Sequence, residues 1–379
     1  MSRARLLSPA AIAAVSCGAA VAVLALALPA FGPQGLAAGW FTASAFVLGL
    51  ALGAMTLLFI HILTGGAWGR ALSPALRALS ATVPLALLLF VPLAAGAEAL
   101  FPWAAADKSA MPEAVRHKLA YLNLPFFMLR FTLCALLWLV LCHLALAWTA
   151  PGEARQRHRH KGGSAAALIA HAVAMLFFTT DWMMSLEPGF LSTIHPMLVM
   201  ASQAASACAV AVMVAALRQN VTREPGGESH STMARDLANI LFGFMLIWAY
   251  MAYMQWLVIW AGDLPHEARW YLRRVEGGWR YLLWLMIGIG FAVPFAGFLS
   301  ARVKGSRRGI IALAACVLAG QALATWWRLR PALPLGPSDV HLADIAGILA
   351  AGGLWAGLFT ALLFRSARLS PCRPEVRHG

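Results

Sequence analysis

The sequence predicts an all-α protein that crosses a membrane about ten times. Three observations predict this fold class. The chain has a mean hydropathy of +0.73, 61% of its 379 residues are hydrophobic, and only 12% are charged. A soluble domain does not need so much apolar surface, whereas a chain embedded in a bilayer presents apolar side chains to lipid as well as to its own core.

The apolar residues fall into ten runs, each long enough to span a bilayer at about 20 residues. They lie near residues 10–31, 41–63, 79–101, 124–149, 164–184, 195–217, 235–261, 279–301, 308–328 and 342–364. The first run suits a spanning helix better than the shorter apolar region of a signal peptide. The connections are short, so we expect a single integral membrane domain over residues 1–379.

The basic residues predict the orientation of the chain. With the N-terminus inside, the inside segments hold 19 of the 29 Lys and Arg and the outside segments hold 9, while Arg130 lies within a span. Because cytoplasmic loops carry an excess of Lys and Arg, both termini are expected in the cytoplasm. The formal net charge of +14 therefore reports topology, and we do not expect a nucleic-acid partner.

The sequence holds no constellation typical of a stand-alone enzyme. The six cysteines are scattered without a CxxC pair, which argues against an iron–sulfur or zinc site. No nucleophile–base set or phosphate-binding glycine loop stands out either. We therefore assign no catalytic residue and no metal ligand, and expect no redox centre held by this chain.

Four polar residues are expected at similar depth on the outer side: Glu98, Arg130, Asp181 and His195. An arginine inside a membrane needs a counter-charge, and Glu98 and Asp181 are the available carboxylates. The group could be a structural ion pair that ties helices together. It could equally take part in proton or quinone chemistry.

Three histidines are expected toward the inner side: His61, His143 and His171. Histidine titrates near neutral pH, so this group could feed an inner half-channel for protons. Three unconnected helix-end histidines, or a pair that binds a b-type haem, are the alternatives. His171 and Asp181 are ten residues apart, or about 15 Å along one helix, and cannot touch.

The seventh run carries an aromatic face. Tyr253, Trp256 and Trp260 recur at the spacing of one helix side. Packing combined with an interfacial belt explains this pattern. A stripe on which quinone stacks is the alternative.

Three stretches of the chain carry a resemblance to a known family. The first stretch covers residues 118–127 and is followed by Arg130. The second contains Asp181, Trp182, Ser185, Glu187 and Pro188. The third runs over residues 236–274, with Trp248, Gln255, Trp260 and Trp270 within it. Together they resemble the F subunit of bacterial alternative complex III, a quinol:cytochrome c oxidoreductase subunit that belongs to the NrfD/polysulfide-reductase-like membrane proteins.

The resemblance implies ten helices arranged in NrfD-like bundles in the bacterial inner membrane. It implies a respiratory quinol-oxidising complex, with an NrfD-like sister subunit, an iron–sulfur subunit and c-type cytochromes as partners, and a haem–copper oxidase beside them. A quinone contact and a proton path are expected. Asp181, His143 and His171 would carry the path, with Arg130 and Glu98 as electrostatic partners. In the ninth run the family often has an Arg and an Asp, where this chain has Gln321 and Ala324.

Two other functions stay open at this point. The same intramembrane charges could line the substrate path of a proton-coupled small-molecule transporter. They could also only hold helices together in a scaffold subunit.

Overall fold

The computed structural model describes residues 9–104, 116–150, 158–187, 189–218, 229–333 and 342–368. These residues form helices and no strand, and nine of the helical segments are long and apolar enough to cross a membrane. This confirms the all-α, multi-pass membrane fold. The location of both termini in the cytoplasm stays a prediction.

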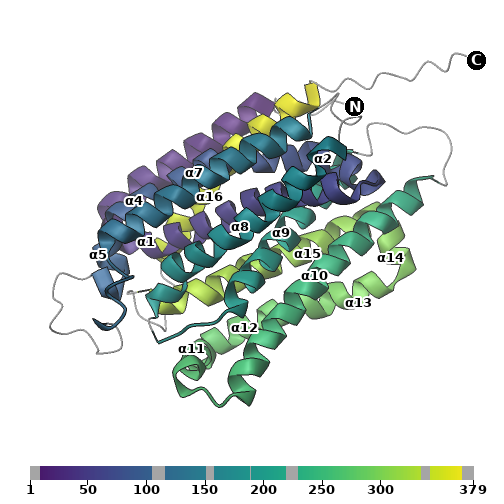
Figure 1. Ribbon diagram of the computed structural model, residues 1–379. Coiled ribbons are helices and arrows are strands. Elements are labelled where there is room, and N and C mark those ends of the chain that lie inside the picture. Colours follow the sequence, from purple (N-terminus) through teal and green to yellow (C-terminus); the bar gives the residue numbers. More distant parts are fainter. Residues whose placement is uncertain are drawn as a thin grey trace, which may run out of the picture.

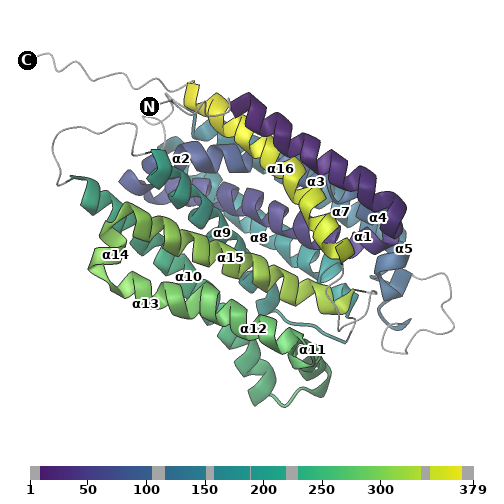
Figure 2. The same cartoon turned by 180° about the vertical axis from the view of Figure 1, so that it is seen from behind.

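The first helix, α1 (Pro9–Thr64), contains two crossing segments. Its 56 residues far exceed the ~20 that one crossing needs. Gly32 has φ 68° and ψ 170°, which breaks the helix just before Pro33. Figure 2 shows the two halves running in opposite directions. The loop expected over residues 32–40 is therefore reduced to one turn at Gly32, because glycine adopts a positive φ without steric cost.

The next crossing is a broken helix. It comprises α2 (Ala67–Ser80), α3 (Val83–Leu88), α4 (Val91–Ala95) and α5 (Ala97–Leu100), followed by η1 (Pro102–Ala104). This crossing begins well before the expected residue 79. Arg77 of α2 donates to the carbonyl of Leu146 at 2.5 Å and to Thr149 at 2.8 Å. A basic side chain expected in a loop therefore caps the end of the next helix.

The central element is α9 (Ile194–Arg218), which contacts α1, α2, α8, α10 and α15. One group of helices contains α1 to α5, α7 (Leu124–Trp148), α8 (Lys161–Trp182) and η3 (Met184–Leu186). The last helix, α16 (Leu342–Arg368), returns to pack along α1. Figure 1 shows α9 between this group and the following one. Many of its buried residues are alanine or serine, which lets neighbouring backbones approach closely.

The second group contains α10 to α15. Its elements are α10 (Ser229–Ala261), α11 (Pro265–Val275), α12 (Trp279–Ile287), η4 (Gly288–Ala292), α13 (Val293–Leu299), α14 (Ala301–Gly305), α15 (Arg307–Leu329) and η5 (Arg330–Ala332). The η4 segment is a turn of π-helix, a feature that often marks functional sites. It packs backbone to backbone on α15, where Gly290 meets Gly320.

Candidate functional site

A buried ion pair joins α7 to the end of α8. Arg130 donates from Nε to one carboxylate oxygen of Asp181 at 2.7 Å and from Nη2 to the other at 2.9 Å. Its Nη1 donates to the carbonyl of Tyr121 at 3.0 Å. The guanidinium carbon also lies 3.8 Å from the centroid of the Tyr121 ring. Such a bidentate fork fixes both side chains, so the pair ties the two helices together.

Aromatic rings surround the residue that follows Asp181. Trp182 is 1% exposed. Six phenylalanine rings lie 4.8 to 6.1 Å from its ring, centroid to centroid: Phe41, Phe90, Phe101, Phe127, Phe131 and Phe178. The Ser185 hydroxyl donates to the backbone carbonyl of Asp181. Residues 181–185 therefore belong to a packed core around the ion pair.

Glu187, which follows this core in the chain, holds α11 in place through two ion pairs. Glu187 lies 3.0 Å from Arg273 Nη1 and 2.7 Å from Arg274 Nη2, oxygen to nitrogen. The two arginines are consecutive residues of α11, so one carboxylate anchors that helix to the end of η3. Pro188 lies outside the described residues.

The three inner histidines lie in different surroundings. His61 is buried, and its Nδ1 is 3.2 Å from the carbonyl of Gly65. His143 is exposed on α7. His171 is buried on α8, where Nδ1 accepts a hydrogen bond from Trp138 at 3.1 Å and Nε2 has no hydrogen-bond partner among the described residues. A proton path through these side chains stays a prediction.

The structure brings together only two of the four outer residues, Arg130 and Asp181. Asp181 is the carboxylate that pairs with Arg130, while Glu98 is exposed on α5. His195 is buried at the start of α9, and its Nδ1 lies 3.0 Å from Gln255 Oε1. It therefore belongs to a cluster with α10 and α11.

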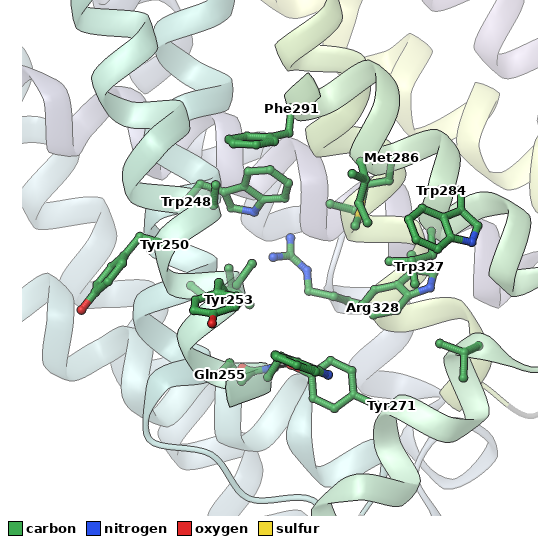
Figure 3. Close-up of a pocket in the computed structure, with 18 of the residues that line it drawn as sticks. Trp248, Tyr250, Tyr253, Gln255, Tyr271, Trp284, Met286, Phe291, Trp327 and Arg328 are labelled. Atoms are coloured by element: carbon green, nitrogen blue, oxygen red, sulfur yellow. Dashed lines mark hydrogen bonds between the residues drawn. The ribbon is translucent and has the colours of Figure 1, made fainter. Parts of the chain in front are cut away.

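A large cavity lies within the second group of helices. Its volume is about 950 Å³, within the range of pockets that hold small ligands. It lies between α10 on one side and α12 and η4 on the other, against α15 (Figure 3). The wall is mostly aromatic and aliphatic, and includes Trp248, Tyr250, Tyr253, Trp256, Tyr271, Trp284, Met286, Phe291 and Trp327.

The cavity opens at the flank of the helices. Tyr253 of α10 and Trp284 of α12 both line it, and they are 54% and 64% exposed. Trp248 and Met286, farther in, are 4% and 7% exposed. Because α10 and α12 both belong to candidate membrane spans, an apolar molecule could enter this opening from the bilayer.

Two hydrogen-bonding side chains stand at the α11 end of the cavity. Gln255 donates from Nε2 to the Tyr271 hydroxyl at 3.0 Å, and its Oε1 faces His195. In this arrangement His195 carries its hydrogen on Nδ1. Burial raises the pKa of Tyr271 to about 12, against the smaller opposing effects of Gln255 and Arg274. The Tyr271 hydroxyl therefore keeps its proton and can donate it to an acceptor in the cavity.

Arg274 fixes the helix that closes this end. It donates to the carbonyl of Arg328 from Nε at 3.2 Å and from Nη2 at 2.6 Å, and its own carbonyl accepts from Trp327 at 3.0 Å. Burial lowers the pKa of Arg274 to about 10, while Glu187 opposes that shift. The side chain thus stays charged near neutral pH and holds α11 against the end of α15.

The sequence predicts neither the cavity nor the burial of Arg328. Arg328 is the last residue of the predicted span 308–328 and is one of the nine Lys and Arg assigned to the outside segments. In the structure it is 8% exposed and lines the cavity. The aromatic residues of α10 are the signal that could have located the pocket. Tyr253 and Trp256 both line it, whereas Trp260 stacks on Trp256 at 5.6 Å.

In the part of the chain that the structure describes, no group of three or more His, Cys, Asp or Glu side chains is placed to hold a metal ion. Comparison of the chain with protein-family models and with curated proteins finds no match.

Proposed function

We propose that this chain is an integral membrane subunit of a respiratory quinol:electron-acceptor oxidoreductase, similar to the F subunit of alternative complex III, and that it contacts quinone. The observation that carries this proposal is the cavity between α10, α12 and α15. It combines an aromatic wall, an opening between α10 and α12, which both belong to candidate membrane spans, and hydrogen-bond donors. These three properties match a flat ring with oxygen acceptors and an apolar tail.

The wall offers a place for each part of such a molecule. Trp248 and Phe291 lie near each other in the wall of the cavity (Figure 3) and could pack against the ring. Arg328 and the Tyr271 hydroxyl can donate to ring oxygens. The isoprenoid tail would leave past Tyr253 and Trp284 into lipid.

The complex would supply the redox centres that this chain is not expected to hold. From the resemblance we propose an NrfD-like sister subunit, an iron–sulfur subunit and c-type cytochromes as partners, with a haem–copper oxidase beside them. We place the complex in the bacterial inner membrane. We propose that Arg130 and Asp181 act in this complex as a structural tie, because the bidentate geometry satisfies both charges.

Purification of the tagged chain from its native membrane in mild detergent tests this function. We expect iron–sulfur and cytochrome c subunits to copurify, quinone to be extracted with the complex, and no haem to stay on the separated chain. A chain that purifies alone and without quinone would contradict the proposal and favour the transporter. Copurification of the partners without quinone in any preparation would instead favour a scaffold subunit.

A further inference from the structure

Arg328 differs from every other buried arginine that the structure describes. Four arginines are buried: Arg130, Arg274, Arg328 and Arg330. Three of them pair with carboxylates, namely Asp181, Glu187 and Asp344. Within the described ranges no carboxylate lies within ion-pair distance of Arg328, so its charge is uncompensated there.

The neutral contacts of Arg328 hold it in place without neutralising it. Its Nη2 donates to the Ser202 hydroxyl at 3.1 Å and to the Thr325 hydroxyl at 3.2 Å. Ser202 in turn donates to Gln321 Oε1 at 2.6 Å. Side chains of α9 and α15 therefore fix one edge of the guanidinium.

Arg328 also lines the cavity. Figure 3 shows the guanidinium pointing into the space bordered by Trp248, Tyr253 and Met286. Nε and Nη1 meet no acceptor among the residues that the structure describes. The wall of the cavity thus includes a positive charge with donors that no described residue satisfies.

An uncompensated guanidinium in a low-dielectric surrounding is costly, and an anionic oxygen at hydrogen-bond distance offsets that cost. Arginine also suits this task because its planar fork can donate two parallel hydrogen bonds. The occupant of the cavity is the available source of this charge. A neutral occupant would leave the charge of Arg328 unpaired.

We propose that Arg328 binds an anionic oxygen of the cavity's occupant, so that the cavity holds the ionised form of an acidic, ring-bearing amphiphile in preference to the neutral form. This inference rests on the proposed quinone contact and specifies the form that is bound. On binding, the ring hydroxyl loses its proton to bulk water, and the oxygen keeps both electrons of the O–H bond. Arg328 is then the residue that selects the charge of the ligand.

A coloured acidic ligand tests this preference. An alkylated 2-hydroxy-1,4-naphthoquinone changes its visible spectrum when the hydroxyl ionises, so the bound form can be read directly as pH is varied. With the purified complex we expect the bound dye to ionise at least one pH unit below the free dye. This shift corresponds to at least tenfold tighter binding of the anion. If the bound dye ionises at the same pH as the free dye, or at a higher pH, the inference is overturned.

Two substitutions at Arg328 and one elsewhere assign the effect. Arg328→Gln is expected to abolish the shift, and Arg328→Lys to retain part of it because the charge is kept. Arg269→Gln removes an exposed cation that does not line the cavity, and should leave the shift unchanged. An undiminished shift in Arg328→Gln would overturn the proposal. The spectrum of the unaltered complex decides the matter even if that variant does not fold.

Two further ligands separate this inference from the proposed function. An alkylated 1,4-naphthoquinone without the hydroxyl tests the ring alone. Its binding at equal strength to the unaltered complex and to Arg328→Gln, with no shift for the acidic dye, would support the quinone contact and overturn the role of Arg328. Oleate, an anion without a ring, is the second ligand. If the unaltered complex binds oleate but neither ring compound, and Arg328→Gln no longer binds oleate, the result would support an anionic oxygen at Arg328 and contradict the quinone contact.

Discussion

Asp181 is expected to stabilise the fold through its pairing with Arg130. Asp181→Asn removes the counter-charge and leaves a buried guanidinium, so we expect a loss of about 3–5 kcal/mol of stability. Thermal unfolding of the purified chain in detergent measures it. Arg130→Met combined with Asp181→Leu should recover much of the loss, since no charge is then left unpaired. A stable Asp181→Asn variant that loses only proton movement would contradict the structural role and restore the proton path.

Tyr271 is expected to act as a neutral donor to the cavity's occupant. Tyr271→Phe should weaken binding of a naphthoquinone by about 0.5–1.5 kcal/mol, or roughly two- to tenfold. Because burial raises the pKa of Tyr271 to about 12 from its ordinary 10, its proton stays bound over the neutral range. In this group the folded state loses stability only as pH rises above the ordinary value, where the unfolded chain ionises. Titration calorimetry should therefore give the same ratio of affinities from about pH 6 to about pH 8. A ratio that changes across that range would count against this role.

Residue-level prediction from sequence succeeds where chemistry leaves few choices. Arg130 within a span requires a carboxylate, and one of the two candidates, Asp181, is its partner. The sequence does not indicate that Arg328 is buried, because a cation at the end of an apolar run has the pattern of a topology signal. Its burial depends on α11, which is held over the end of α15 through Arg274. No local pattern near Arg328 encodes that contact.

At the scale of elements, the contact of η4 with α15 shapes one wall of the cavity. A Cβ at Gly320 would lie 2.1 Å from Cα of Gly290, so Gly320→Ala must separate the two helices. We expect a loss of about 1–3 kcal/mol of stability, and weaker naphthoquinone binding because Met286 and Phe291 would move. Thermal unfolding and a binding titration measure the two effects.

Gly288→Ala is the matched control in the same π-helical segment. A Cβ there would meet no heavy atom within 4 Å, so stability and binding should stay close to those of the unaltered chain. If Gly288→Ala and Gly320→Ala had equal effects, the shape of the cavity wall would not depend on the close approach of Gly290 to Gly320, and the proposed cause of the Gly320→Ala effects would be wrong.

The positions of the spans follow from hydropathy, whereas their irregularities do not. Apolar runs of sufficient length must be helical in lipid, since every backbone polar group needs an internal partner. The early start of α2 escapes that reasoning because Arg70 and Arg77 interrupt the apolar pattern there. The reversal at Gly32 and the π turn at η4 depend on how neighbouring helices pack, and a lone glycine in an apolar run does not specify either one.

At the scale of the whole molecule, the two helix groups differ in what they could do. The first group surrounds its charged pair with aromatic rings and leaves it fully hydrogen-bonded. The second contains the cavity and the unpaired cation. The intramembrane charges Arg130 and Asp181 direct attention to the first group, whereas the second group is indicated in the sequence by the aromatic face of the seventh run. The cavity arises from the packing of α10, α11, α12, η4 and α15. How these helices pack against one another is not encoded in any one apolar run, which explains why the cavity could not be located beforehand.

Photolabelling of the purified complex with a short-chain azido-naphthoquinone tests the quinone contact most directly. We expect the label on the cavity-lining residues of α10 and α12. Ala252→Phe, which fills the cavity, should reduce labelling several-fold. Val258→Phe, on the same helix but outside the cavity and 51% exposed, should not. Label spread over lipid-facing helices, and unchanged by Ala252→Phe, would contradict the quinone contact.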